Sequence, residues 1–244
     1  TYRIVTKHVF PEACCIADHY HIIQELNRRV DKVRIRVQNR FRKTINTLKP
    51  KNNNKTITSE ELIELEEASR YYYVLKKFNW LLASTNKKIL DVNVERRFNH
   101  RLNRYLNYSE ILAYMLAIDD ELEEAFYLRN DVTYFYDHCT YDTAKKQLEK
   151  IIIDFRSSTV AEMSPFANTL TNWKKEIINS FIIVDDKANR KMNTAIVENR
   201  NKSIKLLKHA SNGYLNWERF RNRILYTLNE DTTFYYTSIR KDGK

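Results

Sequence analysis

The stretch of residues 13–48, ACCIADHYHIIQELNRRVDKVRIRVQNRFRKTINTL, contains the two patterns that decide the fold. It opens with an apolar run over residues 13–17 that ends at Asp18, and a run of that length is typical of a buried strand. After Asp18, apolar residues recur at spacings of three and four, which predicts one long helix that reaches Leu48. A strand needs hydrogen-bonding partners, so either residues 13–17 are not a strand or the rest of their sheet lies upstream.

The sequence after Pro50 is dominated by amphipathic helical patterns. A new helix begins at the capping-box pattern Thr58-x-x-Glu61, and Asp119 and Ser164-Pro165 are typical N-terminal signals of later helices. The periodicity predicts helices over residues 59–84, 94–107, 109–117, 119–136, 141–156 and 165–180.

The C-terminal region is predicted to contain a short strand and two further helices. The apolar run 181–184 favours a strand, and a helix follows over residues 193–210. Gly213 is well placed to end that helix in a left-handed C-cap, and Asn216 to cap a last helix. We therefore divide the chain into residues 1–50, a helical region 51–180, and residues 181–244.

The composition excludes several fold and function classes. Only two glycines and three prolines occur in 244 residues, which is too few for a β-sandwich, a β-barrel or a glycine-rich phosphate loop. Hydrophobic residues make up 43% of the chain, which is enough for a packed core. The predicted class is a predominantly helical globular protein.

Positive charge is concentrated in two blocks. Residues 27–51 contain ten Lys or Arg and one acid, and residues 187–223 contain ten and two, within a net charge of +11. Charge segregated in this way indicates a polyanionic partner, either nucleic acid or an anionic membrane surface. On the basic helix the arginines surround the apolar stripe on several sides, so we rank a membrane-surface protein last.

The cysteines and the apolar runs indicate the cellular compartment of the protein. Three cysteines without the spacing of a disulfide framework favour a reducing cytosol. The sequence contains no run of about 18 apolar residues, so no transmembrane helix is predicted, and it shows no signal-peptide pattern. The chain begins at Thr1, so we expect the natural N-terminus upstream.

Two carboxylates have the setting of metal ligands. Asp18 lies where a strand is predicted to end, and it is either the N-cap of the following helix or a rigidly held ligand. The neighbouring His19 and His21 are a weak zinc signal, because residues two apart do not share a helix face. Glu198 shares a helical face with Asn201, Lys202, Lys205 and Lys208. Either this is a solvated helix face, or Glu198 is a metal ligand and the lysines beside it form a ridge of phosphate contacts.

Three blocks of the sequence resemble one family in the right order. The first block is FPEA at 10–13, IADHYHI at 16–22 and LNR at 26–28. The second is SPFANTL at 164–170, followed by Trp173 and Glu176-Ile177. The third is ENRNKSIK at 198–205, SNGY at 211–214 and FRNRI at 220–224. Together they resemble the ISL-three family of bacterial insertion-sequence transposases over essentially the whole chain.

The resemblance implies a DDE-type transposase with a truncated RNase H-like α/β catalytic fold, interrupted by a large all-α insertion. Asp18 and Glu198 would be the second and third catalytic acids and would hold two Mg²⁺ ions. The first aspartate of the family precedes the segment that matches Tyr2, so we expect this chain alone to be inactive. Asn199 stands where the family has glycine, and Thr194-Ala195 replaces an asparagine–glycine pair.

The resemblance also implies partners and a location. The partner is double-stranded DNA, namely transposon ends and target, bound by a homodimer on paired ends in the bacterial cytosol and nucleoid, without a membrane. A non-enzymatic DNA-binding or structural remnant of such an element is the alternative. The residues expected to contact DNA are Arg28, Arg34, Arg200, Asn201, Lys202, Lys205, Lys208, Arg221 and Arg223.

Overall fold

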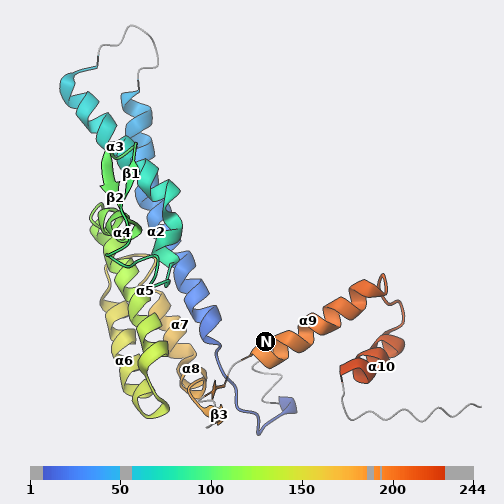
Figure 1. The fold of residues 1–244 in the computed structure, drawn as a ribbon. Coiled ribbons are helices and arrows are strands. Elements are labelled where there is room, and N and C mark those ends of the chain that lie inside the picture. The colour runs from blue at the N-terminus through green and yellow to red at the C-terminus, as the bar shows by residue number, and fades with distance from the viewer. Residues whose placement is uncertain (1–7, 50–56, 186–189, 193, 229–244) are drawn as a thin grey trace, which may run out of the picture. The chain divides into compact units, whose positions relative to one another are not determined.

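The structure is a computed structural model that describes residues 8–49, 57–185, 190–192 and 194–228 (Figure 1). The chain is predominantly helical, as predicted. It divides into two compact units, Thr1–Met192 and Asn193–Lys244, and each is described by itself below.

The long helix predicted after Asp18 is present as α2 (His19–Leu48). Its apolar stripe is buried against α3 (Ser59–Lys77) and α5 (Asp120–His138), and α2 and α3 run alongside each other (Figure 1). The predicted capping box of α3 is confirmed, because the Glu61 N–H donates to Thr58 Oγ1 at 3.2 Å. The helix ends earlier than the predicted residue 84 and is followed by the short 3-10 helix η1 (Asn79–Ala83).

The prediction of a helix over residues 94–107 is wrong. The structure has an antiparallel hairpin there, formed by β1 (Arg97–Asn99) and β2 (Arg104–Leu106). Asn99 Oδ1 accepts hydrogen bonds from the backbone N–H groups of Arg101 and Leu102, at 3.1 and 3.2 Å. Asn103 has a φ of 51°, a left-handed conformation that asparagine tolerates. The two asparagines therefore stabilise a turn between two strands where a helix was predicted.

The other helices of the first unit lie close to their predicted bounds. They are α4 (Tyr108–Leu116), α5 and α6 (Tyr141–Ser157), and Asp119 caps α5 by accepting from the Leu122 N–H at 3.1 Å. The predicted helix 165–180 is divided at Trp173 into α7 (Phe166–Asn172) and α8 (Lys174–Asn179). All of these helices contribute to one buried apolar cluster that extends from Ala17 to Phe181.

Residues 13–17 are extended but do not form the predicted strand. Their described backbone contacts go to α8: the Ala17 N–H donates to the Glu176 carbonyl, and Asn179 Nδ2 donates to the Cys15 carbonyl, both at 2.9 Å. Among the described residues, no strand pairs with this segment, which explains the difference. The second predicted strand is confirmed in part, because β3 (Ile183–Asp185) pairs with β4 (Arg190–Lys191).

The second unit contains the two predicted helices, α9 (Ala195–Ala210) and α10 (Trp217–Leu228). Gly213 has a φ of +97° and donates its N–H to the Lys208 carbonyl at 2.9 Å, which confirms the left-handed cap. Asn216 Oδ1 accepts from the Arg219 N–H at 3.0 Å and so caps α10 as predicted. The predicted connector after Pro50 and the C-terminal tail lie outside the described residues.

In the described part of the chain, no helix combines the length and the apolar character that a membrane crossing requires.

Candidate metal centre and nucleic-acid interface

Asp18 is held rigidly at the start of α2. Its Oδ1 accepts a hydrogen bond from the Tyr20 N–H at 2.8 Å, which confirms the N-cap interpretation. The Asp18 side chain is 8% exposed, whereas that of His19, whose Nδ1 lies 3.5 Å from Asp18 Oδ1, is 60% exposed. A cap and a metal ligand are compatible roles, because a carboxylate has two oxygens and several lone pairs.

Tyr136, from a distant part of the sequence, lies near Asp18 and has aromatic and basic neighbours of its own. The Tyr136 hydroxyl of α5 is buried and has no hydrogen-bond partner among the described residues. Burial raises the pKa of Tyr136, and the nearby charge of Asp18 raises it further. The Tyr136 ring stacks on Phe181 with centroids 5.6 Å apart, and Lys191 Nζ donates to the Tyr136 carbonyl at 2.8 Å.

Sequence reasoning did not identify Tyr136 as a neighbour of Asp18, nor Phe181 and Lys191 as neighbours of Tyr136. Tyr136 lies more than 100 residues from Asp18 along the chain, so no local spacing could link the two. The one local signal is the aromatic cluster 134–136, whose Tyr136 ring packs on Phe181.

Glu198 lies in the first turn of α9, in the second unit. Its Oε1 accepts from Thr194 Oγ1 at 2.9 Å, and its side chain is exposed. Arg200 Nη1 donates to the Leu228 carbonyl at 2.6 Å and so joins α9 to α10. The remaining residues expected to contact DNA in this unit are all exposed: Asn201, Lys202, Lys205, Lys208, Arg221 and Arg223.

The lysines of α9 carry uncompensated charge. Within residues 194–228 and the rest of the described chain, no carboxylate pairs with Lys202, Lys205 or Lys208. Their spacing of three places them on one side of α9 together with Glu198, as the sequence predicts. Such a face can contact several phosphates at once.

The two candidate catalytic acids lie in different units of the structure. Asp18 belongs to the first unit and Glu198 to the second, and each unit is described by itself. Among the described residues, no group of three or more His, Cys, Asp or Glu side chains is arranged to hold a metal ion. The donor chemistry nevertheless fits Mg²⁺, which is commonly bound through one or two carboxylates together with substrate phosphates.

One arginine of the basic block on α2 is buried and bonded within the fold. Arg34 is only 6% exposed, and its guanidinium contacts Asp31 at 2.7 Å, the Leu75 carbonyl at 3.1 Å and Gln38. This geometry favours a structural role for Arg34 over the predicted phosphate contact. Arg28 has a 64% exposed side chain and stays accessible.

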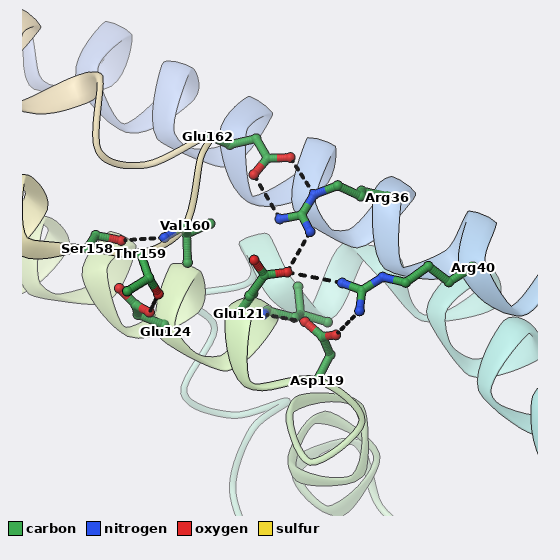
Figure 2. Close-up of polar contacts among 10 residues, drawn as sticks. Arg36, Arg40, Asp119, Glu121, Glu124, Ser158, Thr159, Val160 and Glu162 are labelled. Atoms are coloured by element: carbon green, nitrogen blue, oxygen red, sulfur yellow. Dashed lines mark hydrogen bonds and ion pairs between the residues drawn. The ribbon is translucent and has the colours of Figure 1, made fainter.

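Two further arginines of α2 form an ion-pair network with α5 and the segment before α7 (Figure 2). Arg36 Nε donates to Glu162 at 2.8 Å and its Nη1 to Glu121 at 2.5 Å, while Arg40 contacts Glu121 and Asp119, both at 3.0 Å. The hydrogen bonds that Arg36 donates to Glu162 and Glu121 raise the pKa of Arg36, and the bond from Arg36 lowers the pKa of Glu162. Much of the positive charge of residues 27–51 is therefore neutralised within the fold.

Comparison with known proteins identifies a family. Residues 1–224 match the model of the ISL-three DDE family, which is described as a transposase. Comparison with curated proteins and with solved structures gives no match. The match covers α2, α9 and nearly all of the elements described above, including both candidate acids.

Proposed function

This chain belongs to the ISL-three family of transposases, and we propose that it is the catalytic portion of a DDE enzyme that cleaves and transfers DNA strands. The observation that carries the proposal is the family match over residues 1–224, within which Asp18 is fixed by its own helix cap. We assign residues 1–50 and 181–244 to an RNase H-like catalytic part and residues 51–180 to a helical insertion.

Asp18 and Glu198 are the proposed ligands of two Mg²⁺ ions. When bound, Mg²⁺ supplies Lewis-acid activation of the attacking oxygen and of the scissile phosphate. Asp18 contributes a carboxylate whose position is set by the Tyr20 N–H, and Glu198 one at the start of α9. A first aspartate, which the resemblance places before the segment that matches Tyr2, completes the set in our proposal.

The cations of α9 and α10 are the proposed phosphate contacts. Lys202, Lys205 and Lys208 hold the DNA backbone beside Glu198, and Arg28 is an accessible cation on α2. We further propose that the enzyme acts as a homodimer on paired transposon ends, in the cytosol of a bacterium.

Mg²⁺-dependent nicking of DNA that carries the element ends tests the proposal. The enzyme for this assay is the product of the whole reading frame in which these residues lie. We expect Glu198→Gln to reduce nicking to background, because it removes a metal-binding charge while keeping the shape of the side chain. Glu218→Gln, at an exposed acid of α10, is the matched control and should nick at the wild-type rate.

Unchanged nicking by Glu198→Gln would remove Glu198 from the mechanism. Binding of DNA without nicking by the wild-type enzyme, at any Mg²⁺ concentration, would favour the alternative function of a DNA-binding remnant.

A further inference from the structure

A basic cleft lies at the opposite end of α2 from Asp18. Two adjoining cavities, of about 590 and 640 Å³, share the lining residues Lys49, Ser69 and Arg101. The cleft is formed by the C-terminal end of α2, by α3 and by the turn between β1 and β2. Its cations are Arg42, Lys49, Lys76, Lys77, Arg101 and Arg104, with Arg70 at its edge.

Most of the positive charge in this cleft is not neutralised by the protein, although Glu66 also lines it. Among the described residues, Arg70 pairs with Glu66 at 3.0 Å, whereas no carboxylate pairs with Arg42, Lys76 or Arg101. Arg36 and Arg40, on the same helix as Arg42, differ because both form ion pairs with carboxylates. A concave surface lined by unpaired cations concentrates positive potential and attracts a polyanion.

Two tyrosines hold the cations in place. Lys76 Nζ lies 5.6 Å from the centre of the Tyr72 ring. The Tyr73 ring has two cations near it, Lys77 Nζ at 5.5 Å and the Arg101 guanidinium carbon at 5.6 Å. These cation–π contacts restrict the long side chains, so less entropy is lost when they bind a ligand.

We propose that this cleft, formed by the end of α2 together with the helical insertion, binds the phosphate backbone of duplex DNA. The identity of the polyanion rests on the proposed function, whereas the cleft itself rests on the positions of its side chains. The 30 residues of α2 span about 45 Å, which is the length of about 13 base pairs. The cleft therefore contacts DNA well away from the phosphates beside Asp18.

The salt dependence of DNA binding tests the proposal, measured with this chain and a 30-base-pair duplex (a length of about 100 Å). The cleft variant carries Arg42→Gln, Lys76→Gln, Lys77→Gln and Arg101→Gln. We expect the slope of log affinity against log salt to fall by up to about 3.6, since each lost phosphate contact removes about 0.9. A control variant removes the same charge at exposed positions away from the cleft: Lys87→Gln, Lys88→Gln, Lys145→Gln and Lys146→Gln.

A second variant separates charge from folding. Exchanging arginine and lysine at the same four cleft positions keeps every charge, and we expect it to retain most of the wild-type slope. Equal slopes for the cleft and control variants, both with wild-type circular dichroism, would overturn the inference.

The failure of this inference can be told apart from the failure of the proposed function. If the wild-type chain does not bind DNA, both are overturned. If it binds, and only substitution of the α9 lysines lowers the slope, the proposed function stands and the cleft proposal is wrong.

Discussion

Arg36 shows how a residue in a basic block becomes part of the fold. Its guanidinium connects α2 to Glu162 and Glu121, which lie more than 80 residues away along the chain. The bond from Arg36 lowers the pKa of Glu162, so the folded state binds a proton at that carboxylate less readily than the unfolded chain does. The stabilisation is therefore complete above the usual carboxyl pKa of about 4.3 and is lost as the pH falls through the lowered value.

Replacing Arg36 with methionine should lower the free energy of unfolding at pH 7 by about 1 kcal/mol, because the pairs are partly exposed and screened. The difference from wild type should shrink below about pH 4, where the carboxylates become protonated. Urea unfolding at pH 7 and pH 3 measures both values. Arg28→Met, which removes only a 3.7 Å contact with Glu25, is the control and should change little. A difference that is the same at both pH values would contradict this account.

The elements that were predictable from the sequence are those with local signals. The helices α2, α5 and α9 carry their caps and apolar stripes in their own residues, and each was predicted within about two residues. The hairpin at 97–106 was missed because two asparagines set its turn, while the surrounding apolar spacing resembles a helix. The extended segment 13–17 was misinterpreted because strand pairing depends on non-local partners.

The turn between β1 and β2 depends on the left-handed conformation of Asn103. Asn103 has a φ of 51°, so a β-branched residue there pays the cost of the left-handed region, about 1–2 kcal/mol. We expect Asn103→Val to lower the melting temperature and Asn103→Gly to leave it nearly unchanged. Equal melting temperatures for the two variants would show that the turn adopts another conformation in solution.

Helix α9 is expected to contact DNA through its lysines. Replacing Lys202, Lys205 and Lys208 with alanine should flatten the salt dependence of duplex binding by up to about 2.7, from about 0.9 per contact. Removal of three exposed lysines elsewhere serves as the control: Lys87, Lys88 and Lys146. An unchanged slope in the α9 variant would mean that this face does not touch DNA.

At the scale of the molecule, the buried core belongs to the first unit. The apolar cluster runs from Ala17 to Phe181, and no side chain described in residues 194–228 is buried. We therefore expect a chain that ends at residue 192 to unfold at nearly the wild-type temperature. A loss of cooperative unfolding on this truncation, followed by calorimetry, would show that the second unit supports the core.

The candidate site was predictable only in part. The spacing of residues 13–22 placed Asp18 at a helix start, and the resemblance assigned it and Glu198 as catalytic acids. The burial of Arg34 was not predictable, because it depends on the Leu75 carbonyl of another helix. Nor was the neighbour Tyr136, which only the packing of α5 beside the start of α2 brings near Asp18.

The central claim is that Asp18 acts in catalysis as well as in capping α2, and cleavage by the complete enzyme carrying Asp18→Asn tests it most directly. Asparagine caps helices as well as aspartate does, so the substitution removes the negative charge and keeps the cap. Asp119→Asn makes the same change at the cap of α5 and is the matched control. We predict that Asp18→Asn melts at the wild-type temperature but loses Mg²⁺-dependent cleavage, while Asp119→Asn still cleaves. Wild-type cleavage by a folded Asp18→Asn enzyme would contradict the account.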